Sequence, residues 1–266
     1  MKHLKLNRSL KYILPFRTDD LMRLGNKNDS GYVVSKKALF NTNLMISLGM
    51  SNNWTFENSF LELNSKNRVH IYDHSVGYIS FFLTLLKSIK RFFYLKSNLD
   101  NIFRKIKVLI DYYKLINSNK INHFQIKISN KNYLNKKRLN EILKQVKNKK
   151  ILLSIDIEGD EYIVLDDIFK FHRIIHLIVI EFHHINKKKM KFKKIIKNLK
   201  KFFDIIHIHG NNYTSFCKDN LPITLEITLR NKKIYRINKK ELVKKFPIKQ
   251  IDYPNNVNQD DLKFYY

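Results

Sequence analysis

Short apolar runs alternate with stretches of helical periodicity along most of the chain. Seven mostly apolar runs are expected to be buried strands: 44–48, 69–72, 124–128, 151–155, 177–180, 205–208 and 223–229. Apolar residues at helical spacing predict helices over 54–63 and 161–169, and around 139–146 and 192–199. Apolar strands separated by helices favour a parallel sheet with helices on both faces.

The last two predicted strands have no helix between them, so we expect them to pair antiparallel at one edge of the sheet. The predicted fold class is α/β. It is a Rossmann-like αβα sandwich whose mostly parallel seven-stranded sheet ends in an antiparallel strand. We expect residues 1–266 to form one domain, with a core over about 44–230 and a C-terminal extension over 231–266.

Residues 77–117 interrupt the path between the second and third predicted strands. Apolar residues at helical spacing predict two consecutive helices here, and Arg104, Lys105 and Lys107 lie on the other side of the second one. One interpretation of this helical insertion is a hairpin packed over the edge of the functional site. The other is an element that binds a partner or an anionic membrane surface.

The chain is strongly basic, with 51 lysines and arginines against 23 aspartates and glutamates and a formal net charge of +28. Such a charge attracts nucleic acid, anionic lipid or phosphorylated substrates. The excess of lysine comes with much asparagine and isoleucine, so a bias in codon composition is an equally direct explanation.

Cysteine content and apolar run lengths restrict the compartment. Cys217 is the one cysteine, which excludes a disulfide framework and a cysteine zinc site. Residues 1–10 lack the continuous apolar region of a secretory signal, and no apolar run approaches the roughly 18 residues that span a bilayer. We therefore expect a cytoplasmic protein, with peripheral attachment to a membrane left open.

Polar residues follow the first two predicted strands, where an open parallel sheet binds its ligands. Gly49 ends the first strand in a turn that lets the backbone approach a cofactor, and Asp73 ends the second, where a carboxylate can accept hydrogen bonds from ribose. Ser51 in this turn and Glu57 in the helix after it are assigned to the same site. Residues 49–53 do not form G-x-G-x-x-G, so a cofactor without phosphates, such as S-adenosylmethionine, is favoured.

Polar residues two positions apart end the later strands, a spacing that points both side chains the same way. They are Asp156 and Glu158, Glu181 and His183, and His207 and His209, with Glu226 on the last strand. If these strands are neighbours, the side chains converge in one cleft.

We assign catalysis to His183, Asp156 and Glu158, and acceptor binding to Glu181, His207, His209 and Glu226. His183 is the expected general base, because a histidine with the ordinary pKa of about 6.5 is largely neutral near pH 7. A divalent metal could use the same ligands, but the spacing does not establish its geometry, so no metal site is assigned.

The stretch over 153–162, Leu-Ser-Ile-Asp-Ile-Glu-Gly-Asp-Glu-Tyr, resembles the IDIEGAE signature of the FkbM-type methyltransferases. Stretches 23–33, 207–212 and 251–256 are also similar to members of this family, so the resemblance spans nearly the whole chain. It implies the class I methyltransferase fold, S-adenosylmethionine as cofactor, and O-methylation of a sugar, a glycan or another small metabolite.

The resemblance also implies cofactor contacts at Asp29 and Gly31 and an acceptor contact at Asn211. Relatives usually have glycine where this chain has Ser30, so Ser30 is strained if that position requires a positive φ.

Two other functions fit parts of the sequence. A nucleic-acid methyltransferase fits the positive charge, but the chain has no Asn-Pro-Pro-Tyr or Asp-Pro-Pro-Tyr stretch to hold an exocyclic amine and no Pro-Cys nucleophile. A non-catalytic binding module could share the fold, and it would not bind S-adenosylmethionine. The sequence does not identify the acceptor.

Overall fold

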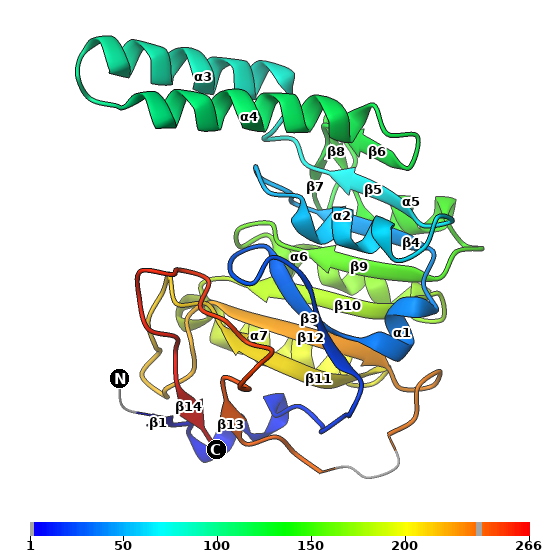
Figure 1. The fold of residues 1–266 in the computed structure, drawn as a ribbon. Coiled ribbons are helices and arrows are strands. Elements are labelled where there is room, and N and C mark those ends of the chain that lie inside the picture. The colour runs from blue at the N-terminus through cyan, green and yellow to red at the C-terminus, as the bar shows by residue number, and fades with distance from the viewer. Residues whose placement is uncertain (1–2, 238–240) are drawn as a thin grey trace.

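A seven-stranded sheet with the order β11-β12-β10-β9-β4-β5-β6 forms the centre of the computed structural model, which describes residues 3–237 and 241–266 (Figure 1). Its strands are β4 (Leu44–Leu48), β5 (Arg68–Tyr72), β6 (Ile121–Phe124), β9 (Ile151–Ile155), β10 (Ile175–Phe182), β11 (Phe203–Gly210) and β12 (Leu225–Asn231). Neighbouring strands are parallel except at β12, which pairs antiparallel with both β10 and β11. Residues 1–2, at the start of the segment inspected for a signal, and 238–240, in the predicted C-terminal extension, lie outside the described residues.

The apolar strands supply two hydrophobic cores, one on each face of the sheet. Side chains alternate between the faces, so Ile46 and Leu153 belong to one cluster while their neighbours Met45 and Leu152 belong to the other. The helices around the sheet are α1 (Lys36–Phe40), α2 (Thr55–Glu62), α5 (Leu139–Gln145), α6 (Glu161–Val164) and α7 (Ile185–Leu199). This is a Rossmann-like α/β fold with a mostly parallel sheet.

Smaller elements complete the described chain. They are β1 (Leu4–Lys5), β13 (Lys245–Phe246), β14 (Phe264–Tyr265), the hairpin of β2 (Leu21–Gly25) and β3 (Gly31–Ser35), the pair β7 (Lys127–Ile128) and β8 (Lys136–Lys137), and two 3-10 helices, η1 (Arg8–Ile13) and η2 (Leu165–Phe171). The β2–β3 hairpin lies over the sheet near β12 and carries residues to the functional site (Figure 1).

Two predicted elements differ from the structure. The strand expected over 124–128 is misplaced: β6 ends at Phe124, and the amide of Ile126 donates to the Phe124 carbonyl at 2.8 Å in a tight turn. The next two residues form β7, which pairs with β8 outside the main sheet. The helix expected over 161–169 is α6 followed by the 3-10 helix η2.

The predicted insertion contains two long helices, α3 (Tyr78–Phe93) and α4 (Leu99–Ile116), which pack against each other as a hairpin. Figure 1 shows that this hairpin projects beyond the β6 edge of the sheet, so that its far end stands clear of the remaining fold. In the described part of the chain, no helix combines the length and the apolar content needed to cross a membrane.

Candidate active site

A cleft of about 860 Å³ lies at the carboxyl ends of β4, β5, β9 and β10. Ten of the predicted site residues line it: Asp29, Gly49, Ser51, Glu57, Asp73, Asp156, Glu158, Glu181, His183 and Asn211. The fold therefore brings five of the six residues assigned to the cofactor, the three assigned to catalysis and two of the five assigned to the acceptor to the same cavity.

Gly49 lies where the turn after β4 meets the end of β9 in this cleft. Its φ is +83°, and a Cβ atom built on it would lie 1.7 Å from the carbonyl oxygen of Asp156. A side chain at position 49 is therefore excluded by the backbone at the end of β9 as well as disfavoured by the left-handed conformation. The turn after β4 and the end of β9 lie in direct contact for this reason.

Asp73 organises the turn that follows β4. Its Oδ2 accepts hydrogen bonds from the backbone amides of Met50 and Ser51 at 2.8 and 3.1 Å, and its Oδ1 accepts from the amide and hydroxyl of Ser75. Burial alone would raise the pKa of Asp73, but the hydrogen bonds from Ser75, Met50 and Ser51 outweigh it and lower that pKa. The carboxylate is ionised near neutral pH, and its hydrogen bonds stabilise both the turn after β4 and the turn after β5.

Glu57 lies in the first turn of α2 with its side chain buried. The hydroxyl of Ser47 donates to Glu57 Oε1 at 2.6 Å. Burial raises the pKa of Glu57 to about 7, so this carboxyl is partly protonated at neutral pH. It can both donate to and accept from a ligand in the cleft.

The turn of the β2–β3 hairpin reaches the cleft through Asp29 and Ser30. The strain expected at Ser30 is confirmed by its φ of +64°. Gly31 does not line the cleft, and a Cβ there would lie 1.8 Å from the carbonyl oxygen of Asn26. The glycine is thus needed for close packing inside the hairpin turn rather than for contact with a cofactor.

His183 follows β10 and is held by a carboxylate that the sequence analysis did not identify. Its Nδ1 lies 2.9 Å from Oε1 of Glu161, a fully buried residue that begins α6. This contact directs Nε2 toward three other carboxylates, at 3.3 Å from Glu181, 3.5 Å from Glu158 and 3.8 Å from Asp156.

The pKa of His183 differs from the ordinary value on which the expectation of a neutral imidazole rests. Burial alone would lower the pKa of His183, but the contacts with Glu161 and Glu181 outweigh it and raise the pKa to about 11. The imidazole is therefore protonated near pH 7 and has no free nitrogen to act as a base. Its positive charge holds the surrounding carboxylates together.

Asp156 and Glu158 have different surroundings, although they are two residues apart. Burial, together with nearby Glu181, raises the pKa of Asp156. The Asp156 Oδ1 atom is inaccessible to solvent and receives no hydrogen bond from the described residues. Glu158 has a left-handed φ of +53° and a side chain that is 85% exposed. The strained turn thus places one carboxylate inside the cleft and the other at its mouth.

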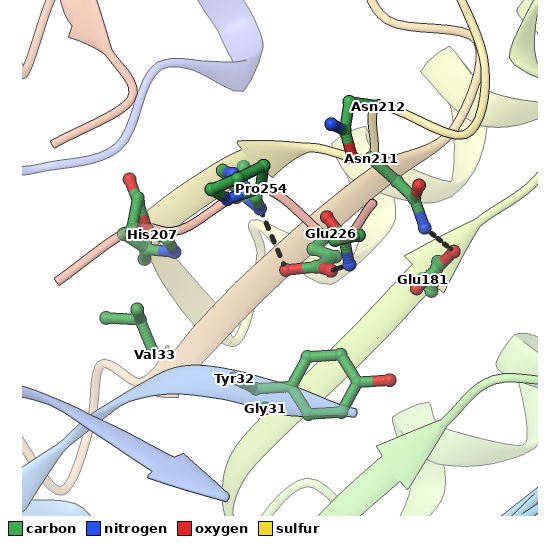
Figure 2. Close-up of polar contacts among 12 residues, drawn as sticks. Gly31, Tyr32, Val33, Glu181, His207, Asn211, Asn212, Glu226 and Pro254 are labelled. Carbon is green, nitrogen blue, oxygen red and sulfur yellow. Dashed lines mark hydrogen bonds and ion pairs between the residues drawn. The ribbon is translucent and has the colours of Figure 1, made fainter. Parts of the chain in front are cut away.

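Glu181 and Asn211 form a polar pair on the acceptor side. Figure 2 shows the Asn211 side chain pointing at Glu181, and its Nδ2 donates to Glu181 Oε1 at 2.9 Å. Burial raises the pKa of Glu181. Tyr32 was missed by sequence reasoning. It lines the same cleft, and its hydroxyl lies 3.5 Å from Asp156 Oδ2.

Three residues assigned to the acceptor are not brought to the cleft. His207 pairs with Asp252 at 2.9 Å, and His209 lies 3.3 Å from Glu226 and 3.1 Å from Asp261. All three are buried, and none lines the cavity. For the histidines the reason is strand order, because β12 lies between β10 and β11 and separates them from His183. Glu226 lies on β12 itself, where Asn255 Nδ2 donates to its Oε1 at 2.7 Å. These histidines instead bind the C-terminal segment to the sheet.

The charge of the cleft is opposite to that of the whole chain. Its described lining holds seven carboxylates, Asp29, Glu57, Asp73, Asp156, Glu158, Asp160 and Glu181, with Lys127 as its one lysine and no arginine. S-adenosylmethionine has a sulfonium and an ammonium group, so it fits this donor set. A diphosphate would be repelled by it.

Asp156, Glu158 and His183 could also hold a divalent cation, since one ligand atom from each lies within 4.8 Å of the others. The alternative partner for the same carboxylates is the protonated His183 itself, which already neutralises part of their charge. The described contacts are explained without a metal ion.

A Rossmann-like sheet with one antiparallel strand, and a cleft suited to a cationic cofactor, fit the fold of class I methyltransferases. The model of the methyltransferase FkbM domain matches residues 36–206, more than half of the chain. The chain therefore belongs to the FkbM methyltransferase family, the resemblance seen in its sequence is confirmed, and S-adenosylmethionine is its methyl donor.

Solved structures resemble the chain more distantly. A spermidine synthase from Thermotoga maritima shares 11% identity over 100% of this chain and 90% of its own, with a TM-score of 0.39. A fibrillarin pre-rRNA processing protein from Methanococcus jannaschii shares 11% over 73% and 68%, with a TM-score of 0.38. A precorrin-6y C5,15-methyltransferase from Geobacter metallireducens GS-15 shares 9% over 72% and 82%, with a TM-score of 0.37. Such low scores carry no argument about function. No curated protein matches the chain.

Proposed function

We propose that this methyltransferase O-methylates a hydroxyl of a sugar, a glycan or another small metabolite. The observation that carries the proposal is the Asp156 carboxylate, which lines the cleft with its side chain 35% exposed although its Oδ1 atom is inaccessible. A carboxylate accepts a hydrogen bond from a hydroxyl group, so the accessible side of Asp156 suits the hydroxyl of an acceptor.

Asp156 is the proposed general base, in place of His183. When bound, S-adenosylmethionine supplies a methyl group whose bond to sulfur breaks as its bond to the acceptor oxygen forms. The proton of that hydroxyl passes to the Asp156 carboxylate on its accessible side. Glu161 fixes the His183 ring, and the imidazolium lies 3.8 Å from Asp156 Oδ1, where it stabilises the carboxylate before the transfer. Glu158, at the mouth of the cleft, offers a route for the proton to solvent.

The acceptor side suits a molecule rich in hydroxyl groups. Glu181 presents carboxylate oxygens and Asn211 an amide, which together bind hydroxyl donors and acceptors. A ribose–phosphate backbone is less suited, because the carboxylates that line the cleft would repel its phosphates. The proposal therefore favours a neutral, polyhydroxylated acceptor over RNA.

Methyl transfer from tritium-labelled S-adenosylmethionine tests the proposal. The purified protein would be given monosaccharides, oligosaccharides and polysaccharide in one set of reactions and total RNA in another. We expect label in the sugar fractions and none in RNA. Label confined to RNA would replace the acceptor class with nucleic acid, for which the basic exterior would be the explanation.

Calorimetry with S-adenosylmethionine and with its demethylated product separates catalysis from a non-catalytic role. An enzyme of this class binds both compounds. A protein that bound neither would be a binding module on a methyltransferase fold, and the assignment of Asp156 as a base would lapse.

A further inference from the structure

The hairpin of α3 and α4 exposes a second apolar face besides the one that packs. Phe81 and Tyr112 are buried where the hairpin joins the fold, with ring centroids 5.0 Å apart. Other large apolar side chains are exposed: Ile79, Phe82, Leu83, Leu86 and Phe93 on α3, and Leu99, Phe103, Ile110 and Tyr113 on α4. Single exposed apolar residues are ordinary, but a contiguous set marks an interaction surface.

The exposed residues of each helix lie on one face. Steps of three, four and seven connect positions 79, 82, 83, 86 and 93 on α3, and the same spacing connects 99, 103, 110 and 113 on α4. The two faces meet in a shallow apolar groove lined by Tyr78, Ile79, Phe82, Leu83, Leu109, Ile110 and Tyr113. The hairpin therefore presents one apolar surface to which both helices contribute.

Lysines border this surface. At about 100° per residue, Lys87 flanks the exposed stripe of α3 and Lys107 and Lys114 flank that of α4, while Lys90 lies within the α3 stripe. All four are exposed. Between residues 78 and 116 the sequence has eight lysines and arginines and two aspartates, a formal charge of +6.

We propose that this hairpin surface docks on an anionic lipid bilayer, with its apolar stripes at the level of the acyl chains and its lysines among the head groups. The charge selects this occupant. Lysine is depleted in interfaces between proteins, whereas an apolar face bordered by lysines is the pattern of helices that lie in the surface of an anionic membrane. Ile79 and Phe93 are 77% and 78% exposed, so the stripe is free to enter a bilayer.

The position of the hairpin permits such docking without unfolding the site. It projects past the β6 edge, with its far end away from the sheet (Figure 1). Leu95, in the connection between the helices, is 95% exposed. The inference does not depend on the methyl acceptor, since no residue of the exposed stripe lines the cleft.

Vesicle co-sedimentation tests the proposal with the full chain. The probes are vesicles of phosphatidylcholine alone and of phosphatidylcholine with phosphatidylglycerol, each at low and high salt. We expect binding to the mixed vesicles at low salt that is at least about tenfold tighter than to the neutral ones and that weakens at high salt.

Two pairs of variants test the two contributions. Ile79→Ser with Phe103→Ser should weaken binding about tenfold or more, whereas Leu134→Ser with Met190→Ser, which changes equally exposed residues elsewhere, should not. Lys87→Glu with Lys107→Glu should remove the preference for anionic lipid. Lys193→Glu with Lys194→Glu, two exposed lysines of α7, changes the same net charge and should leave most of that preference.

Calorimetry with S-adenosylmethionine on every variant would show that the cleft is intact, so a failure here is distinct from a failure of the proposed function. Equal binding to neutral and anionic vesicles, or wild-type binding by the hairpin variants, would overturn the proposal. A dimer that Ile79→Ser with Phe103→Ser converts to a monomer would assign the surface to a second copy of the chain instead.

Discussion

The cleft and the α3–α4 hairpin are opposites in charge and polarity within one strongly basic chain. The cleft is lined by carboxylates, and its polar side chains are bound to one another through Glu161, His183, Glu181 and Asn211. The hairpin has a formal charge of +6 and exposes apolar side chains whose partners are not in the described chain.

The difference shows why a net charge is a poor guide to a substrate. A total of +28 suggests a polyanion as ligand, yet the cavity where chemistry can occur repels one. Charge on the exterior determines which surfaces or large partners the protein attracts, while charge within the cleft determines which ligands bind there. The predictions below test the two regions separately.

The largest effect is expected at Asp156. Asp156→Asn replaces the carboxylate with an amide, which cannot take a proton, so single-turnover methyl transfer should fall roughly 100-fold or more. His183→Ala should have an effect of similar size, because it removes the cation between the carboxylates. S-adenosylmethionine affinity, measured separately by calorimetry, should change little in both variants. Normal turnover by Asp156→Asn would contradict its role as the base.

The next effect is expected at Asp73. Asp73→Ala leaves the amides of Met50 and Ser51 without their acceptor and removes a carboxylate that ribose could contact, so S-adenosylmethionine binding should weaken by about 1–3 kcal/mol. Asp73→Asn is the matched control, since it retains an acceptor oxygen and should lose less. Calorimetry measures both. Affinity equal to that of the wild type in the alanine variant would remove Asp73 from the cofactor site.

A third effect concerns stability rather than catalysis. Burial raises the pKa of Glu57 in the folded protein to about 7 from its ordinary value of 4.5, so the fold favours the protonated carboxyl. Its contribution to stability is present below pH 4.5 and is lost as the pH rises toward 7, by up to about 3 kcal/mol at 1.36 kcal/mol per pKa unit.

Glu57→Gln should abolish that part of the pH dependence, because the amide can still accept the hydrogen bond from Ser47 and never ionises. Urea unfolding at pH 5 and pH 8 measures it. Glu62→Gln, which changes an exposed residue of the same helix, is the control and should leave the dependence of the unfolding free energy on pH unchanged. A Glu57→Gln variant that loses stability between these pH values as steeply as the wild type would show that Glu57 ionises normally.

The smallest effect is expected from removal of divalent cations. If His183 neutralises the carboxylates, methyl transfer in excess chelator should proceed at the rate seen without it. Loss of activity that returns on addition of Mg²⁺ or Mn²⁺ would make Asp156, Glu158 and His183 metal ligands and would remove Asp156 as a base.

Much of the sheet was predictable because its strands are apolar on both faces. β4 and β9 have the predicted limits, and the polar residues after β4, β5, β9 and β10 had to meet at one edge of a parallel sheet. The same reasoning failed for His207 and His209. A spacing of two residues puts side chains on one face, but it does not report that β12 separates their strand from β10.

Two members of the site gave weaker signals. Glu161 lies six residues after the end of β9, within a predicted helix. It matches the last residue of the IDIEGAE signature, and that position is the signal that could have assigned it to the site. Tyr32 reaches the cleft only because the β2–β3 hairpin folds over the sheet, a contact between segments far apart in the sequence. The exposure of the α3–α4 hairpin could not be predicted either, because an apolar stripe in the sequence is the same whether or not another element covers it.

Because Gly49 lies against the carbonyl of Asp156, the turn after β4 and the proposed base cannot move independently of each other. A methyl group at position 49 could be accommodated only by moving the β4 turn away from the end of β9. Such a shift would change the distance between the methyl donor and the acceptor, although the side chains of the cofactor side and of the acceptor side would stay the same. Variants designed to admit larger acceptors would therefore have to change residues of the cleft away from this point and leave the contact between Gly49 and Asp156 intact.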